Sequence, residues 1–266
     1  MNKKFIKNLF ICLFLIFSIC ISIFIINDQT NTVKTIKKRG EILVGTTGDY
    51  QPLSYLNPTT NNYVGFDIEL AKDLAKNLDV KIKFVPTSWP TLMDDTINKK
   101  FDLAICGITI TEERKKQALM SDGYLTNGKT VLCRKEDANK YTSIDAINKQ
   151  EVRVMENPGG LNEKFARENL PKSTLIIHNI NEEIPGLIAS GKADVMITET
   201  IEAIFYSNKN TLLSAPLAKT PFTKGQIGIL LPKENKNLLD YVNKFLTKER
   251  TSGRLKQIED SYIGTK

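Results

Sequence analysis

The stretch FDLAICGITITEERKK, residues 101–116, contains the pattern that decides the fold. Its apolar first part, residues 101–107, predicts a buried strand, and the polar turn that follows leads into a helix predicted over residues 112–119. A buried strand that passes through a short loop into a helix is the repeating unit of α/β folds. The same unit recurs on both sides of this stretch.

Two series of strands and helices are predicted, each about a hundred residues long. The first has strands over 41–47, 81–89 and 101–107 and helices over 66–79, 90–100 (opened by Pro90) and 112–119. The second has strands TVLCRK, EVRVMEN, STLIIHN and ADVMITE, with helices near 143–149, 161–170, 181–190 and 199–206. Such alternation predicts parallel sheets joined by helical crossovers. We therefore expect two α/β lobes with a cleft between them.

The first 26 residues differ from the rest of the chain. Lys3, Lys4 and Lys7 precede an apolar run of 18 residues from Leu9 to Ile26, which is typical of an export signal. The run is also just long enough to span a bilayer, and no small-x-small cleavage site follows it. We expect an exported protein whose leader, 1–26, is a cleaved signal peptide or a membrane anchor. Residues 27–40 are interpreted as a linker.

The net charge of +7 does not indicate a nucleic-acid partner. Residues 1–40 contain seven basic residues and one acidic residue, a net +6, so residues 41–266 carry only +1. A nearly neutral folded region does not attract the negatively charged phosphates of a nucleic acid, so such a partner is not expected.

Cysteine and histidine usage argues against metal and triad chemistry. Cys106 and Cys133 are the only cysteines after the leader, with neither a CxxC pattern nor a neighbouring histidine. They are either one disulfide or two buried apolar side chains. His178 is the only histidine and lies in an apolar run, so we expect it to be structural and the chain to lack a Ser-His-Asp triad. No metal or cofactor is expected.

In open α/β sheets, ligands bind beyond the carboxyl ends of the strands. Here these ends fall near 46–50, 86–91, 106–114, 156–162 and 198–202. Arg114 is either a carboxylate clamp or a solvated residue of a charged helical turn. Trp89, the only tryptophan, either stacks on a flat ligand ring or packs in the core.

Two further strand ends carry candidate residues. Asn157-Pro158-Gly159-Gly160 precedes a helix, so its backbone N–H groups either bind an anion or form an ordinary turn. Glu199 and Glu202 begin the next helix, where acids complement the helix dipole. A general acid at this position needs burial that outweighs the dipole.

Several motifs together resemble the bacterial solute-binding proteins for polar amino acids (extracellular solute-binding proteins, family 3). They are GFDIELAKDLA, FDLAICGITITEERKK, SDGY and GKADVMITET, and the resemblance covers about residues 36–264. It implies the two-lobe periplasmic-binding-protein-like fold (type II), each lobe a mainly parallel sheet flanked by helices. Lobe 1 would comprise 41–122 plus 228–266 and lobe 2 residues 127–223, with hinges at 121–126 and 224–228. It also implies Arg114 as the carboxylate clamp.

A narrower resemblance points to a group of enzymes built on this fold, the cyclohexadienyl dehydratases. It is carried by GTTGDYQPLSY, VPTSWPTLM, NGKTVLC, NPGGLNEKFAREN and ADVMITETIEA. These enzymes remove water and carbon dioxide from prephenate or arogenate, which gives phenylpyruvate or phenylalanine. The resemblance implies Glu202 as the general acid, with Lys129 and Asp49 at catalytic positions. The substrate site would comprise Trp89, Thr109, Arg114, Asn157, Gly159, Gly160, Leu161 and Glu199.

The chain departs from both groups in ways that leave an alternative open. Leu161 stands where a threonine hydroxyl is usual, and Glu199 replaces the aspartate that holds the ammonium group of an amino-acid ligand. Leu212 and Leu213 stand where a second cysteine would pair with Cys133. The alternative to the enzyme is a non-catalytic receptor that delivers an amino acid or small carboxylate to an ABC transporter permease.

Overall fold

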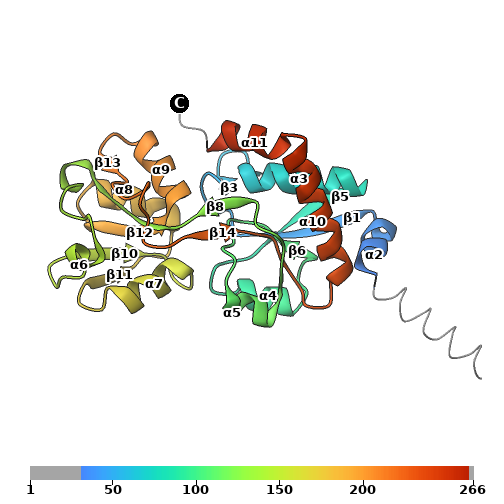
Figure 1. The fold of residues 1–266 in the computed structure, drawn as a ribbon, viewed down its shortest axis with the longest axis horizontal. Helices are drawn as coiled ribbons and strands as arrows, with labels where there is room; N and C mark the ends of the chain where they lie inside the picture. Colours follow the sequence, from blue (N-terminus) through green and yellow to red (C-terminus); the bar gives the residue numbers. More distant parts are fainter. Residues whose placement is uncertain (1–30, 264–266) are drawn as a thin grey trace, which may run out of the picture.

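The computed structural model describes residues 31–263 and consists of two α/β lobes (Figure 1). The leader 1–26, with its cleavage or anchoring, lies outside the described residues. Within residues 31–263, no helix is long and apolar enough to cross a bilayer. Each lobe contains a five-stranded sheet with helices on both sides, as the sequence pattern predicts.

The sheet of lobe 1 has the strand order β5-β1-β6-β15-β7. β1 (Glu41–Thr46) pairs in parallel with β5 (Lys81–Pro86) and β6 (Leu103–Ala104). β15 (Leu230–Leu231) pairs antiparallel with β6 and with β7 (Leu119–Met120), because the chain re-enters this lobe from the opposite end. The helices of lobe 1 are α2 (Thr32–Arg39), α3 (Phe66–Leu78), α4 (Leu92–Ile97), α5 (Glu112–Gln117), α10 (Lys236–Thr251) and α11 (Arg254–Tyr262).

The sheet of lobe 2 has the strand order β11-β10-β12-β9-β13. Its strands are β9 (Lys129–Arg134), β10 (Arg153–Glu156), β11 (Thr174–Ile177), β12 (Val195–Glu199) and β13 (Leu213–Ser214). β10 is parallel to β11 and β12, whereas β9 is antiparallel to β12 and β13. The helices are α6 (Ile144–Ile147), α7 (Leu161–Asn169), α8 (Ile184–Ala189) and α9 (Thr200–Lys209), with 3₁₀ turns at Lys135–Asp137 and Asn181–Glu183. Both sheets are therefore mixed, with a parallel half and an antiparallel half.

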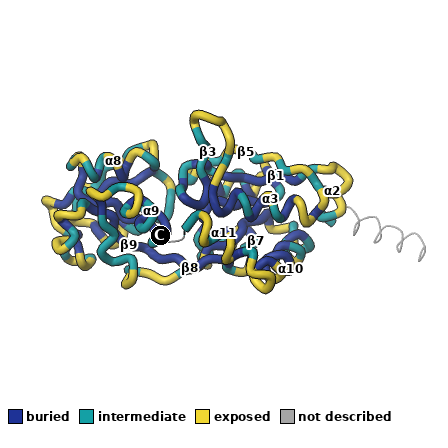
Figure 2. Tube along the Cα trace, turned by 90° about the horizontal axis from the view of Figure 1, so that it is seen from above, coloured by how far each residue is buried: buried dark blue, intermediate teal, exposed yellow. Residues whose placement is uncertain are grey.

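Two antiparallel strands join the lobes. β8 (Leu125–Asn127) and β14 (Gly225–Ile227) pair with each other and run side by side from one lobe to the other (Figure 1). Buried residues gather in both lobes (Figure 2), and each lobe has two hydrophobic clusters, with Ile201 of lobe 2 packed against one of those of lobe 1. We propose residues 121–126 and 224–228 as the hinge segments, because these crossings are the covalent links between the two cores.

The prediction of a linker over 27–40 is wrong for its second part, because residues 32–39 form helix α2. The Asn31 side chain accepts a hydrogen bond from the Lys34 amide at the N-terminus, and Gly40 adopts the left-handed conformation at the C-terminus. Ile36 is fully buried in the core of lobe 1. The Thr32 hydroxyl also bonds to the Asn235 side chain before α10, 2.9 Å away. The two helix caps and the buried Ile36 side chain therefore stabilise this basic stretch as a helix of lobe 1.

A small antiparallel sheet between β1 and α3 was not predicted. It consists of β2 (Asp49–Tyr50), β3 (Ser54–Asn57) and β4 (Asn62–Val64). The strands are too short to show an alternation of apolar and polar residues, and the prolines at 52 and 58 are more typical of a loop than of a strand. This sheet follows the first strand end of lobe 1, so it positions residues at the cleft.

The segment after β5 also differs from the prediction. The strand expected over 81–89 ends at Pro86, and the helix expected to open at Pro90 begins at Leu92. Residues between them form a turn in which the amides of Thr91 and Leu92 bond to the Ser88 carbonyl, at 3.1 and 2.8 Å. Trp89 therefore projects from a turn and not from a strand end.

Gly65, just before α3, lies close to the backbone at Leu53, and a substitution at Gly65 tests this contact. Its φ is +131°, and a Cβ atom there would lie 2.3 Å from the Leu53 carbonyl oxygen. We expect Gly65→Ala to lower the free energy of unfolding by about 1–3 kcal/mol, through backbone strain and steric overlap. Urea denaturation measures this change. Gly186→Ala in α8, where a Cβ meets no atom within 4 Å, is the matched control, and its unfolding midpoint should not fall. Equal midpoints for the two variants would contradict the prediction.

Candidate active site

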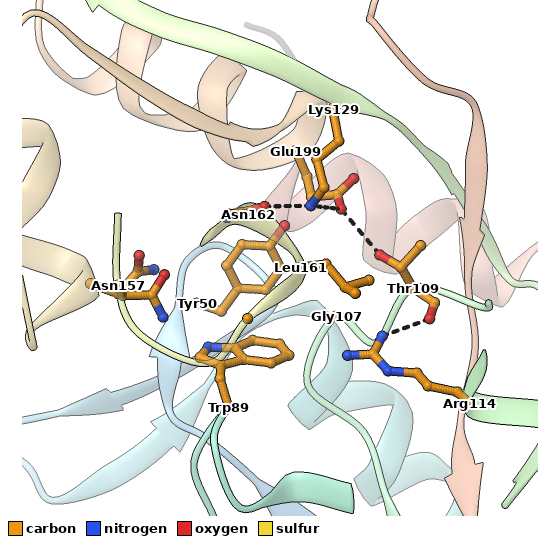
Figure 3. A pocket seen from close by; sticks show the side chains of 12 residues that line it. Tyr50, Trp89, Gly107, Thr109, Arg114, Lys129, Asn157, Leu161, Asn162 and Glu199 are labelled. Carbon is orange, nitrogen blue, oxygen red and sulfur yellow. Dashed lines mark hydrogen bonds and ion pairs between the residues drawn. The ribbon is translucent and has the colours of Figure 1, made fainter. Parts of the chain in front are cut away.

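A cavity with an empty volume of about 370 Å³ lies between the lobes, at the carboxyl ends of strands from both (Figure 3). All five segments expected from the strand ends contribute to its lining. The lining residues are Tyr50, Trp89, Gly107, Thr109, Arg114, Lys129, Asn157, Gly160, Leu161, Asn162, Asn181 and Glu199. Of the residues proposed from the sequence, Asp49, Gly159 and Glu202 are not in this lining.

Arg114 brings a positive charge to the cavity. The Thr111 side chain caps α5 by accepting a hydrogen bond from the Arg114 amide, which fixes the start of the helix. The guanidinium Nη1 donates to the Thr109 carbonyl at 2.7 Å. Burial lowers the pKa of Arg114 from its usual value. Arg114 has no ion-pair partner within 4 Å among the residues that the structure describes, so its charge is available to an anion in the cavity.

Trp89 forms an aromatic wall together with Tyr50. Their ring centroids lie 5.8 Å apart with the planes at 89° (Figure 3). The indole Nε1 donates to Asp49 Oδ1 at 3.1 Å, which fixes the orientation of the ring. Asp49 therefore orients the Trp89 ring through this hydrogen bond and does not itself line the cavity. Burial raises the pKa of the Asp49 carboxyl group.

The glycine turn before α7 contributes less backbone to the cavity than we expected. Gly159 has a φ of +79°, and its Cβ would lie 2.7 Å from the Pro90 backbone of the other lobe, so the position requires glycine. The Gly159 amide donates to Glu163 Oε2 at 2.6 Å and is thus already bonded within the turn. Gly160 lines the cavity at the N-terminus of α7. Leu161 presents an apolar side chain beside it, as the sequence departure indicates.

Lys129, Glu199 and Thr109 form a chain of contacts across the cavity. Lys129 Nζ lies 2.6 Å from Glu199 Oε1, and the same oxygen accepts a hydrogen bond from Thr109 Oγ1 at 3.1 Å. Lys129 Nζ also donates to Asn162 Oδ1 (Figure 3). Thr109 belongs to lobe 1 and the other residues to lobe 2. This chain therefore holds the two lobes together around the cavity.

Glu202 lies directly behind the cavity wall, in the first turn of α9, and is fully buried. Its Oε2 accepts a hydrogen bond from Thr198 Oγ1, and its Oε1 accepts one from Asn181 Nδ2 at 3.0 Å. Burial raises the pKa of Glu202 to about 8, against the effect of these two donors. Glu202 therefore holds a proton at neutral pH, which a glutamate exposed at a helix N-terminus would not do.

The sequence reasoning missed Tyr50, Gly107, Asn162 and Asn181. Asn181 links the lobes, since its Nδ2 donates both to Glu202 and to the Asp49 carbonyl, each at 3.0 Å. Its Oδ1 is buried and has no hydrogen-bond partner in the described structure. Gly107 leaves space for Tyr50, whose ring lies 2.3 Å from where a Cβ would stand. Tyr50 and Asn162 directly follow residues that we singled out, whereas the stretch NINEEI around Asn181 carries no recognisable signal.

Neither metal chemistry nor thiol chemistry is indicated by the geometry of the described residues. Residues 31–263 contain no group of three or more His, Cys, Asp or Glu that could hold a metal ion. Cys106 and Cys133 are both buried and free, so they are apolar core residues and do not form a disulfide. The arrangement offers two aromatic rings, an arginine, a lysine–glutamate ion pair and one protonated acid behind the lining.

The chain belongs to the bacterial extracellular solute-binding proteins, family 3, which it matches over residues 42–265. It is 38% identical to the cyclohexadienyl dehydratase of Pseudomonas aeruginosa, over 88% of this chain and 87% of that one. It is also 28% identical to a glutamine-binding protein of an ABC transporter from Bacillus subtilis, over 89% and 86% of the two chains.

The chain is also similar to two solved structures, one of a binding protein and one of a dehydratase. One is an ancestral amino acid-binding protein described as a precursor of cyclohexadienyl dehydratase, at 36% identity and a TM-score of 0.81, covering 88% of this chain and all of the other. The second is an ancestral cyclohexadienyl dehydratase, at 48% identity and a TM-score of 0.56, covering 88% and 97%. The type II binding-protein fold expected from the motifs is thereby confirmed.

Proposed function

We propose that the protein is a cyclohexadienyl dehydratase, which converts prephenate, arogenate or both by decarboxylative dehydration. The proposal is supported by dehydratases among its relatives and, in its own structure, by one observation above all. Glu202 is a fully buried carboxyl group behind the wall of the interlobe cavity, with its pKa raised to about 8. A receptor for a solute has no need of a proton donor at this place, whereas a dehydratase requires one.

The reaction needs only acid catalysis and positioning. Prephenate carries a carboxylate on one ring carbon and a hydroxyl on the carbon opposite. Transfer of the Glu202 proton to this hydroxyl breaks the carbon–oxygen bond and releases water. The bond to the carboxylate then breaks, its electron pair enters the ring, and carbon dioxide leaves as the ring becomes aromatic. Glu202, now ionised in a buried site, recovers its proton from solvent before the next turnover.

The other residues are assigned to binding and positioning. Arg114 would bind a carboxylate with its planar guanidinium, and the indole of Trp89 would lie against the ring. Asn157, Gly160 and Leu161 line the lobe 2 side. Asn181 lies between Glu202 and the cavity, so its side chain has to move aside when the substrate binds for Glu202 to come within hydrogen-bond reach of the hydroxyl. Asp49 acts through Trp89. Holding the substrate between two lobes supplies the orientation and excludes water.

A second candidate is a non-catalytic receptor for an amino acid or small carboxylate, working with an ABC permease. The observation that favours it is Arg114, because a buried cation can clamp the carboxylate of a carried solute as well as that of a substrate. For either function we propose that the chain acts outside the cytoplasm, in keeping with the name of its family. N-terminal sequencing of the exported protein tests whether residues 1–26 are removed.

Turnover distinguishes the two functions. We expect the purified protein to convert prephenate to phenylpyruvate or arogenate to phenylalanine. No conversion of either, together with a large thermal shift caused by one amino acid, would establish the receptor.

The pH dependence of the turnover gives a further prediction. Glu202 has to be protonated to act, and its pKa in the free protein is about 8. We therefore expect kcat/KM to be high below pH 8 and to fall by about tenfold per pH unit above it. Initial rates between pH 6 and 10 measure this. A rate that stays constant up to pH 10, or that already falls tenfold per pH unit from pH 6, would mean that the acid does not have the raised pKa of Glu202.

A further inference from the structure

The cations and the carboxylate of the cavity are not arranged to receive an ammonium group. An α-amino acid needs a cation for its carboxylate and an acidic or carbonyl acceptor for its ammonium. Arg114 meets the first need, as described above. Glu199 is the carboxylate in the cavity lining that could meet the second.

Glu199 is already occupied by two donors. Its Oε1 contacts Lys129 Nζ at 2.6 Å and Thr109 Oγ1 at 3.1 Å, and the side chains of Lys129 and Glu199 are only 8% and 6% exposed. A buried ion pair of this kind is costly to separate, because each partner would be left as an uncompensated charge. A ligand ammonium bound to Glu199 would also lie beside the Lys129 ammonium and be repelled by it.

Lys129 retains a donor that suits a different ligand. An ammonium group has three N–H donors, and two of those of Lys129 are directed to Glu199 and Asn162. The third can donate to a keto oxygen or a second carboxylate, groups that only accept hydrogen bonds. Arg114 and Lys129 outweigh Glu199 by one charge, so the lining is complementary to an anion without an amino group.

We propose that the Lys129–Glu199–Thr109 chain makes the cavity selective for 2-oxo acids over the corresponding 2-amino acids. Combined with the proposed dehydratase function, on which this step rests, the preferred substrate is prephenate, and arogenate is the poorer one. Glu199 sets this preference through its length, since its carboxylate spans from Lys129 in lobe 2 to Thr109 in lobe 1.

Two measurements on the full chain test the proposal. Calorimetry compares the binding of phenylpyruvate with that of L-phenylalanine, which differ only in the keto and amino groups. Kinetics compares kcat/KM for prephenate and arogenate. We expect the oxo acid to bind at least tenfold more tightly and prephenate to be favoured at least tenfold. Tighter binding of L-phenylalanine, or arogenate turned over equally well or better, would overturn the proposal.

Variants show whether the ion-pair chain is the cause. Glu199→Asp keeps the charge but shortens the side chain, so it should lose the contact to Thr109 and shift the substrate ratio toward arogenate by about tenfold. Lys129→Met should leave Glu199 free for an ammonium and shift the binding ratio toward L-phenylalanine. Lys140→Met, which removes a surface ion pair with Asp137 on lobe 2, is the control and should leave both ratios unchanged. Unchanged ratios in both Glu199→Asp and Lys129→Met would overturn the assignment.

Failure of this proposal differs from failure of the proposed function. If neither prephenate nor arogenate is converted but phenylpyruvate still binds more tightly than L-phenylalanine, the dehydratase assignment falls and the ligand selectivity is supported. If both are converted but arogenate is preferred, the enzyme is supported and the selectivity falls.

Discussion

Glu202→Gln should lower the turnover of prephenate by about 10²–10⁴-fold, the usual contribution of a positioned general acid. Glutamine has nearly the same shape, and its side-chain oxygen can still accept the hydrogen bond from Asn181 Nδ2. Its amide, however, cannot give a proton to the leaving hydroxyl. The loss should therefore fall on kcat, with the affinity for phenylpyruvate kept within a few fold. Single-turnover kinetics and calorimetry separate the two effects.

The control for this substitution is Glu112→Gln. Glu112 begins α5, its side chain is 83% exposed, and it forms an ion pair with Lys115 on the same helix. The control should retain the wild-type rate. If Glu202→Gln also retained most of the activity, a different group would supply the proton and the mechanism above would be wrong.

The stability of the protein should fall as the pH rises from about 4 to about 8, and Glu202 should be a main cause. In the unfolded chain its pKa is ordinary, about 4.3, whereas in the folded chain it is raised to about 8. Between these values the folded state keeps a proton that the unfolded state releases, so deprotonation favours unfolding. The stabilising contribution is complete below pH 4.3 and is lost as the pH rises through 8. The loss for this one group is on the order of 5 kcal/mol.

Urea denaturation of the wild type and of Glu202→Gln at pH 4, 6 and 8 measures this effect. Glutamine does not titrate, so the variant should match the wild type near pH 4 and exceed its free energy of unfolding increasingly toward pH 8. Part of the slope should remain in the variant, because burial also raises the pKa of Asp67, to about 7, and that of Glu156. Parallel pH curves for the two proteins would show that Glu202 titrates normally in the folded state.

The segments that line the cavity were predictable from the sequence, because they follow from local patterns. Short apolar runs mark the strands, and the rule that ligands bind at their carboxyl ends is enough to select the segments of Trp89, Arg114, Asn157 and Glu199. The binding-protein fold was recognisable for a similar reason. Its motifs combine a helix face, a strand and a turn in a fixed order along the chain.

The chemical state of the site was not predictable. The position of Glu202 at a helix N-terminus favours ionisation, as do the hydrogen bonds that it accepts from Asn181 and Thr198, and only its complete burial outweighs them. Asn181 comes from a 3₁₀ turn that contacts Asp49 132 residues earlier in the chain. No local pattern reports such a contact. The helix α2 and the sheet of β2, β3 and β4 were missed because capping and pairing, rather than hydrophobic period, determine them.

Cys106 and Cys133 allow the two lobes to be followed separately. Each thiol is completely buried, Cys106 in the core of lobe 1 and Cys133 in the core of lobe 2. Burial raises the pKa of both thiols to about 12, so neither reacts until its own core opens. Because no disulfide joins them, each can be alkylated independently, and the modified peptide identifies which half of the molecule opened. Each lobe thus contains one natural thiol probe, and the alkylation rate of that thiol measures how often the core around it opens.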